Sequence, residues 1–140
     1  MKIAVVTGTS TGIGLTTSLH LARNGYQVFA GMRNLAKAEA LQTAAAAENL
    51  PVTVVQLDVC DADSVAQAFA EVEKTGPVDV LINNAGALYN PRELTSEGLE
   101  RSFALLLLSP YRLTTGIKLL LDQSHGARVI NVVSGGMYSQ

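Results

Sequence analysis

Short apolar runs recur along the chain and are separated by longer segments with helical character. Each run is rich in Val, Ile and Ala, the composition of strands that are buried on both faces. The runs predict five strands, at Ile3–Val6, Tyr26–Met32, Val52–Leu57, Val78–Ile82 and Ala127–Val133.

The segments between these runs predict helices. The first begins near Gly12 and continues through Leu15–Arg23, and Asn24-Gly25 then signals its end. A second helix is predicted at Leu35–Glu48, with Asn34 as its cap, and a third at Ser64–Lys74, where Asp61 and Asp63 open the helix. A long fourth helix is predicted to begin after Thr95 or Ser96 and to run toward Gln123, with a kink at Pro110.

Strands that alternate with helices indicate parallel βαβ units with right-handed crossovers. We therefore expect an α/β fold with a doubly wound, parallel five-stranded sheet of the Rossmann-like order 3-2-1-4-5, in one domain over residues 1–140. Helices that follow strands one and two should cover one face of the sheet, and those that follow strands three and four the other. A ligand crevice is expected at the carboxyl ends of strands one and four, where the order reverses.

The turn between the first strand and the first helix reads TGTSTGIG from Thr7 to Gly14. Gly8 and Gly12 permit backbone angles that a Cβ would forbid, and they let a pyrophosphate approach the main chain. The helix that follows would direct unpaired N–H groups at that phosphate. The alternative for such a turn on its own is a glycine-rich connection that binds nothing.

Composition narrows the choice of ligand. Hydrophobic residues make up 48% of the 140-residue chain, the net charge is −2, and no basic cluster occurs, so neither nucleic acid nor an anionic membrane is an expected partner. The longest apolar run, Phe103–Leu108, is too short to span a bilayer. Cys60 is the only cysteine, which suits a reducing cytoplasm, and the isolated His20 and His125 indicate no metal site.

The second strand ends where a dinucleotide-binding protein distinguishes its cofactors. About twenty residues after the glycine turn, an acidic residue would hold the ribose 2′-hydroxyl of NAD, whereas an Arg would bind the 2′-phosphate of NADP. Met32 occupies the acidic position and Arg33 follows it. This favours NADP over NAD, and the alternative is a solvated arginine in a loop.

The glycine spacing TGxxxGxG, together with Asn83-Asn84-Ala85-Gly86 after strand four, resembles the short-chain dehydrogenase/reductase family. The resemblance covers the whole chain and implies that Asp58 and Val59 contact the adenine and that Ala85 and Gly86 lie beside the nicotinamide ribose. A turn or cap role for Asp58 is an equal alternative. The expected cofactor-binding residues are Gly8, Ser10, Thr11, Gly12, Ile13, Gly14, Arg33, Asp58, Val59, Asn84, Ala85 and Gly86.

Catalysis in this family uses a Ser after strand five, a Tyr and Lys in a Y-x-x-x-K motif, and an Asn in the long helix. Ser134 stands at the serine position and is the one expected catalytic residue. Tyr138 follows it too closely to begin the motif, and Leu106 occupies the asparagine position, where a core or interface role is the simpler reading. We therefore interpret the chain as the cofactor-binding part of such an enzyme, truncated after strand five.

Three functions follow from these observations. The chain is an NADP(H)-binding module without turnover, an active carbonyl reductase or alcohol dehydrogenase, or a structural domain that self-associates. We also predict a homodimer, because strands four and five should lack their usual cover on one face. The apolar residues expected there are Val80, Ile82, Ile130 and Val132, and the apolar helix around Leu106 adds to them.

Overall fold

The computed structural model describes residues 1–134. Its core is a parallel sheet of five strands in the order β3-β2-β1-β4-β5, which confirms the predicted topology. The strands are β1 (Lys2–Thr7), β2 (Tyr26–Met32), β3 (Val52–Gln56), β4 (Val80–Asn83) and β5 (Arg128–Asn131).

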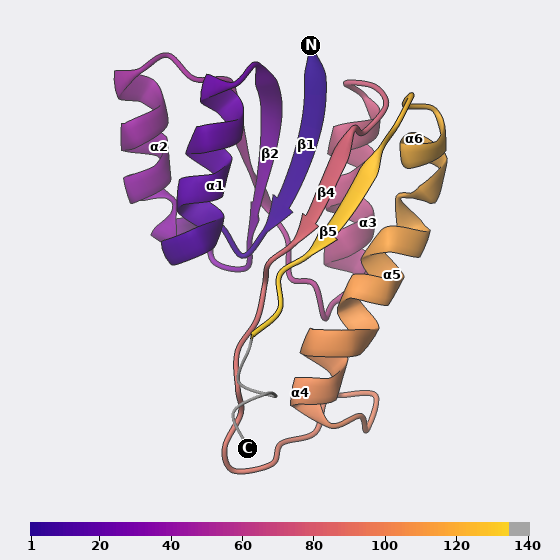
Figure 1. Ribbon diagram of the computed structural model, residues 1–140. Helices are drawn as coiled ribbons and strands as arrows, with labels where there is room; N and C mark the ends of the chain where they lie inside the picture. The colour runs from indigo at the N-terminus through magenta and orange to yellow at the C-terminus, as the bar shows by residue number, and fades with distance from the viewer. Residues whose placement is uncertain (135–140) are drawn as a thin grey trace.

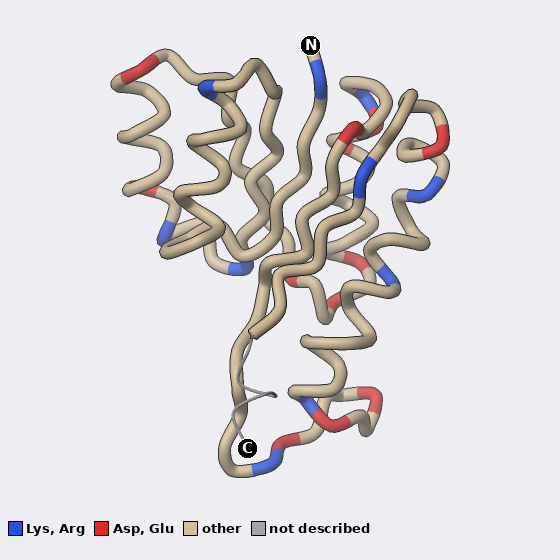
Figure 2. Tube along the Cα trace, viewed as in Figure 1, with Lys and Arg blue, Asp and Glu red and all other residues tan. Residues whose placement is uncertain are grey.

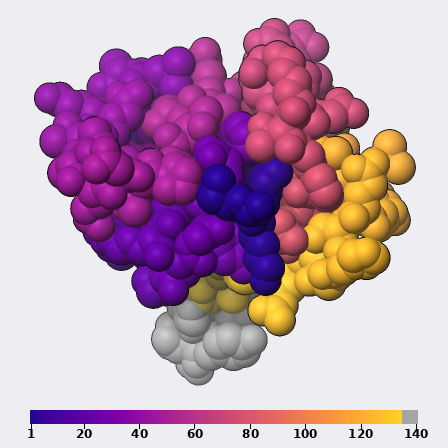
Figure 3. All heavy atoms as spheres, turned by 90° about the horizontal axis from the view of Figure 1, so that it is seen from above, coloured from indigo at the N-terminus to yellow at the C-terminus, as the bar shows by residue number. Residues whose placement is uncertain are grey.

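Helices cover both faces of the sheet (Figure 1). On one face, α1 (Gly12–Arg23) and α2 (Glu39–Ala47) bury Leu19 and Leu41 against β1 and β2. On the other, α3 (Ala62–Glu73), α5 (Ser109–Gly116) and α6 (Lys118–Asp122) pack over β1, β3 and β4. Seen from the N-terminal end of β1, this first strand lies between the early helices and the later elements (Figure 3).

The helix expected at Leu35–Glu48 is divided. Leu35–Lys37 forms a 3₁₀-helical turn, which Asn34 caps by accepting a hydrogen bond from the Ala36 N–H at 3.0 Å. The α-helix α2 begins only at Glu39. Asn34 is therefore a cap, as predicted, but of the short turn.

The long helical segment differs more from the prediction. Glu100, and not Thr95 or Ser96, caps α4 (Arg101–Phe103), where its carboxylate accepts from the N–H groups of Ser102 and Phe103. A π-helical turn (Ala104–Leu108) follows and leads directly into α5, in which Pro110 lies in the first turn. Pro110 has no N–H to donate to a preceding carbonyl, so the irregular turn lies where its effect was predicted.

Two buried apolar residues correct the predicted surface. Val80 and Ile82 of β4 are 7% and 6% exposed, because they pack in the same cluster as Leu19 and Ala22 of α1. The expectation that strand four lacks cover is therefore wrong. Strand five differs: Ile130 is 44% exposed and Val132, just beyond the strand, 40%.

Charged residues lie mainly in the helices and loops, with both signs interspersed along the chain (Figure 2). No helix within residues 1–134 is long and apolar enough to cross a membrane. In the same range, no group of three or more His, Cys, Asp or Glu side chains could hold a metal ion.

Candidate functional site

The carboxyl ends of the strands surround a cleft of about 490 Å³. Its lining comes from the glycine turn after β1, the loops after β2 and β3, and the loop that connects β4 to α4. Eleven of the twelve predicted cofactor-binding residues line it: Gly8, Ser10, Thr11, Gly12, Ile13, Arg33, Asp58, Val59, Asn84, Ala85 and Gly86.

The glycine turn has the backbone that its sequence predicted. Gly8 and Gly12 have φ angles of +70° and +57°, which residues with a Cβ rarely adopt. A Cβ on Gly8 would lie 2.7 Å from the Ala85 Cα, and one on Gly12 would meet open space. Gly8 therefore lets the turn and the β4 loop approach each other, whereas Gly12 leaves room on the cleft side.

Gly14, the twelfth predicted residue, lies beneath the turn. It is buried in α1, and a Cβ there would stand 2.2 Å from the Gly8 carbonyl oxygen. The small size of Gly14 therefore lets the helix pack directly against the turn that precedes it.

The N-terminus of α1 opens into the cleft without a side-chain cap. Thr11 is its N-cap residue but accepts no hydrogen bond from the first turn, and that turn contains no acidic residue. Unpaired N–H groups and the positive end of the helix dipole favour an anion at such a position.

Asparagine side chains hold the strand ends together. The Asn84 amide donates to the carbonyl oxygens of Thr7 and Gly8, both at 3.0 Å, and the Thr7 hydroxyl accepts from the N–H groups of Asn84 and Ala85. Asn83 donates to the Asn131 side chain at 2.8 Å, which joins β4 to β5. The two asparagines therefore tie β4 to the ends of both neighbouring strands, β1 and β5.

The two alternatives for Asp58 are both compatible with its position. Its carboxylate accepts a hydrogen bond from the Cys60 N–H at 3.0 Å, as a turn aspartate does, and the residue also lines the cleft. Arg33 is exposed at the end of β2, and within residues 1–134 no carboxylate forms an ion pair with it. Its guanidinium is thus available to a ligand.

The loop between β4 and α4 contributes residues that sequence reasoning missed, among them Tyr89, Thr95 and Arg101. The Arg101 guanidinium lies 3.9 Å from the centre of the Tyr89 ring and is hydrogen-bonded to Glu93, which raises its pKa. The loop folds back through backbone bonds from Arg101 to Glu93 and from Thr95 to Leu99. No local sequence signal marks these residues, because only the folded loop brings them to the cleft.

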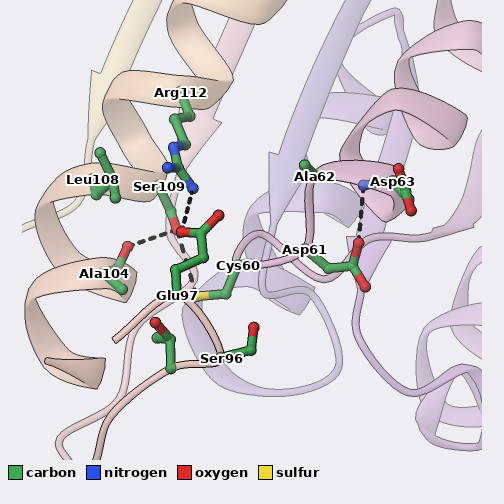
Figure 4. A pocket seen from close by; sticks show the side chains of 11 residues that line it. Cys60, Asp61, Ala62, Asp63, Ser96, Glu97, Ala104, Leu108, Ser109 and Arg112 are labelled. Atoms are coloured by element: carbon green, nitrogen blue, oxygen red, sulfur yellow. Dashed lines mark hydrogen bonds and ion pairs between the residues drawn. The ribbon is translucent and has the colours of Figure 1, made fainter. Parts of the chain in front are cut away.

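A second cavity, of about 300 Å³, adjoins the cleft on the α3 side and shares Cys60 and Thr95 with it (Figure 4). Arg112 of α5 extends to Glu97 of the loop, with 3.2 Å between Nη1 and Oε2. The Cys60 sulfur lies 3.5 Å from the Ser109 hydroxyl, which itself donates to the Ala104 carbonyl. The Arg112–Glu97 ion pair joins the β4–α4 loop to α5, and the Cys60–Ser109 contact joins the β3–α3 loop to the same helix.

Among the described residues, neither the expected catalytic Ser134 nor Leu106 lines the cleft. Ser134 follows β5, is exposed, and is not among the described residues that line the cleft. Leu106, predicted to be a core or interface residue, is 47% exposed in the π-helical turn, and its Cδ2 would lie 3.4 Å from a Cβ on Gly86. Tyr138 lies outside the described residues.

Comparison with known proteins agrees with this geometry. The model of the short chain dehydrogenase family matches residues 2–138. Human dehydrogenase/reductase SDR family member 12 is 38% identical over 99% of this chain and 44% of its own length, and mouse retinol dehydrogenase 12 is 37% identical over 95% and 43%. The chain thus spans less than half the length of these relatives.

Two solved structures also have a fold similar to that of this chain. A metagenomic short-chain oxidoreductase in complex with NADP has a TM-score of 0.81 at 26% identity, covering 95% of this chain and 62% of that one. A blue fluorescent protein from a metagenomic library, in complex with NADPH, has a TM-score of 0.80 at 30% identity, covering 96% and 56%.

Proposed function

The chain belongs to the short-chain dehydrogenase family, and from this premise we propose that it is an NADP(H)-binding module. The proposal rests on two features that lie in the same cleft. The uncapped N-terminus of α1 offers N–H groups to a pyrophosphate, and Arg33 offers a guanidinium without an ion-pair partner in residues 1–134. The two similar structures named above hold NADP or NADPH, which supports this choice of cofactor.

The remaining lining residues match the other parts of a dinucleotide. Asp58 and Val59 would contact the adenine, while Asn84, Ala85 and Gly86 would lie beside the nicotinamide ribose. Gly8, Ser10, Thr11, Gly12 and Ile13 would surround the pyrophosphate, with Gly14 supporting them from below. NAD is the less favoured cofactor, because Met32 stands where a carboxylate would hold the 2′-hydroxyl.

We propose further that the 140-residue chain by itself does not turn over carbonyl substrates. A nicotinamide cofactor, when bound, supplies the hydride of such a reaction. The protein must then deliver a proton to the substrate oxygen. A Ser134 hydroxyl orients a carbonyl by donating a hydrogen bond but is no proton source at neutral pH, and Leu106 carries no acid–base group. An active reductase is the alternative function.

Self-association is also proposed, on the basis of exposed apolar side chains. Phe103, Leu106, Leu107 and Tyr111 are 46–67% exposed along one stretch of the long helical segment. At β5 and directly after it, the apolar side chains of Val129, Ile130, Val132 and Val133 are also exposed. A cytoplasmic location stays a prediction that rests on the single cysteine.

A pair of glycine variants tests the binding function. Gly12 and Gly25 lie at opposite ends of α1, both have left-handed φ angles, and neither would place a Cβ within 4 Å of other atoms. Gly12→Ala and Gly25→Ala should therefore lose similar stability, about 1 kcal/mol each. Only Gly12 lines the cleft, so only Gly12→Ala should weaken the binding of NADPH in a fluorescence titration.

Equal NADPH affinity in the two variants would contradict the placement of the pyrophosphate. If the unaltered chain binds neither NADPH nor NADH at millimolar concentration, the structural-domain alternative replaces the proposal.

A further inference from the structure

Three of the described residues that line the cleft are charged: Arg33, Asp58 and Arg101. In the function proposed above, Arg33 binds the 2′-phosphate and Asp58 contacts the adenine, which leaves Arg101 without a role. This residue begins α4, and the fold of the β4–α4 loop brings it back to the cleft. Its surroundings indicate what it recognises.

The guanidinium of Arg101 is held in one orientation by two neighbours. Its Cζ lies 3.9 Å from the centre of the Tyr89 ring, so the ring covers one face of the planar group. Its Nη1 is hydrogen-bonded to the Glu93 carboxylate, and its backbone N–H donates to the Glu93 carbonyl at 2.9 Å. The side chain nevertheless stays 36% exposed. The stack thus covers one face of the guanidinium and leaves the other for a ligand.

A short hairpin in the loop brings Arg101 close to another residue of the cleft wall. Leu94 and Glu100 form an antiparallel bridge, and the Thr95 N–H donates to the Leu99 carbonyl at 2.8 Å. Arg101 directly follows Glu100, and Thr95 directly follows Leu94. Thr95 and Arg101 both line the cleft, so the hairpin fixes them as parts of one wall.

This wall stands at the end of the cleft where the adenine is expected. Thr95 and Cys60 each line both the cleft and the cavity that adjoins it, so they lie at the same end of the cleft. Cys60 is two residues after Asp58, and its N–H donates to the Asp58 carboxylate at 3.0 Å. The hydrogen bond to Glu93 is the main reason why the pKa of Arg101 is raised, and the charge of Cys60 contributes to the same rise. Arg101 and Asp58 therefore belong to the same end of the cleft.

A guanidinium that is fixed in this way differs in its chemistry from a free one. Phosphate groups bind arginine through its N–H edge, and the Glu93 carboxylate already takes part of this edge and offsets the charge. The open face suits a flat, uncharged ring, because guanidinium planes stack on π systems. Leu105, four residues after Arg101, is buried and also lines the cleft, which adds apolar surface for such a ring. Adenine is the part of NADP(H) that matches these surroundings.

We propose that the guanidinium of Arg101 stacks on the adenine of the cofactor, with Tyr89 supporting its other face and Glu93 fixing its plane. This inference rests on the proposed binding of NADP(H) and adds to it a residue that recognises the base as a flat ring. Asp58 would contact the edge of the same base. Because NAD and NADP contain the same adenine, Arg101 would strengthen the binding of both, whereas Arg33 would distinguish them.

Three variants separate stacking from charge and from anchoring of the loop. Arg101→Met removes the guanidinium but keeps an unbranched side chain, and Arg101→Lys keeps the positive charge but has no planar group. Arg112→Met is the matched control, because Arg112 forms an ion pair with Glu97 of the same loop but lines the second cavity and not the cleft. Calorimetric titration of NADPH, NADH and adenosine 2′,5′-bisphosphate gives three dissociation constants for each variant, and thermal unfolding checks that each variant is folded.

Arg101→Met should raise the dissociation constants of all three ligands by a similar factor, roughly fivefold, because each ligand contains the adenine and loses one cation–π contact. Arg101→Lys should show a similar loss, because an ammonium group has no plane that stacks on the base. Arg112→Met should leave all three constants unchanged. The equal effect on NADPH and NADH distinguishes this role from that of Arg33, whose removal should affect NADPH alone.

Other results would overturn the stacking in distinguishable ways. Full affinity in Arg101→Lys would show that the ligand recognises charge and not a plane, and full affinity in Arg101→Met would exclude the contact altogether. A loss that spares NADH would assign Arg101 to the 2′-phosphate, and a loss that spares the bisphosphate would assign it to the nicotinamide half. An equal loss in Arg112→Met would show that Arg101 only anchors the loop. If the unaltered chain binds none of the three ligands, the proposed function itself is refuted, and this inference with it.

Discussion

Replacement of Arg33 by Ala tests cofactor preference most directly. The side chain is exposed at the rim of the cleft, and within residues 1–134 it forms no ion pair that the substitution would disrupt. The fold should therefore be unaffected, and the measured change should report the ligand contact alone. Only NADPH carries the 2′-phosphate that Arg33 would bind, so NADH serves as an internal reference.

The magnitude follows from the exposure of the site. A hydrogen bond to a charged group contributes about 1.5–3 kcal/mol, and an exposed pair lies at the lower end because solvent screens it. A loss of about 1.4 kcal/mol raises the dissociation constant of NADPH roughly tenfold. The preference for NADPH should also fall with added salt, because the Debye length shortens from about 10 Å at 0.1 M to about 3 Å at 1 M.

Titration of both cofactors by fluorescence or calorimetry measures these constants. Arg23→Ala is the control, because it removes the same charge from an exposed arginine that pairs with Glu48 and does not line the cleft. We expect this variant to bind both cofactors like the unaltered chain. If Arg33→Ala weakens the binding of NADPH and NADH equally, or leaves the binding of both unchanged, the assignment of Arg33 to the 2′-phosphate is refuted.

Three further predictions concern chemistry, packing and pH. The 140-residue chain should not oxidise NADPH with a panel of aldehydes and ketones, and steady turnover that Ser134→Ala abolishes would show the site to be active. Gly14→Ala should lower the free energy of unfolding by about 1–3 kcal/mol, because the new Cβ would lie 2.2 Å from the Gly8 carbonyl oxygen. Chemical denaturation measures this change, and an unchanged unfolding midpoint would contradict the packing. Burial raises the pKa of Asp79, but hydrogen bonds from the Ser124 hydroxyl and the Ile3 N–H outweigh burial and lower the pKa overall. The ionised Asp79 therefore stabilises the fold above about pH 4, and this stabilisation is lost as the pH falls through the lowered pKa. Asp79→Asn should therefore reduce the loss of stability as the pH falls below about 4, and an identical acid-unfolding profile would exclude this contribution.

The fold was predictable because its signals are local. Each buried strand of a parallel sheet is an apolar run, and the left-handed φ angles at Gly8 and Gly12 are a local backbone requirement that glycine meets. Gly8 and Gly12 accordingly have the φ angles that the sequence implied. The same locality explains why Arg33, directly after β2, was placed at the cleft, whereas Asp58, two residues after β3, was placed there by the family resemblance.

The cleft wall formed by Tyr89, Thr95 and Arg101 was not predictable, because it depends on contacts between positions with no periodic pattern. The ring of Tyr89 meets an arginine twelve residues later, and Glu93 fixes that arginine from a third position. The start of the long helix was misplaced for a related reason. Thr95 has the residue type of a cap, but its hydroxyl accepts from the Leu99 N–H within the loop, and Glu100 caps the helix.

The correction at β4 determines where a second copy could bind. If Val80 and Ile82 were uncovered, the adhesive surface would be broad and lie on one face of the sheet, and two copies would stack face to face. The structure instead buries both residues beside α1 and leaves β5 exposed on both of its faces. The proposed self-association therefore rests on the apolar side chains that stay exposed along the long helical segment, Phe103, Leu106 and Leu107.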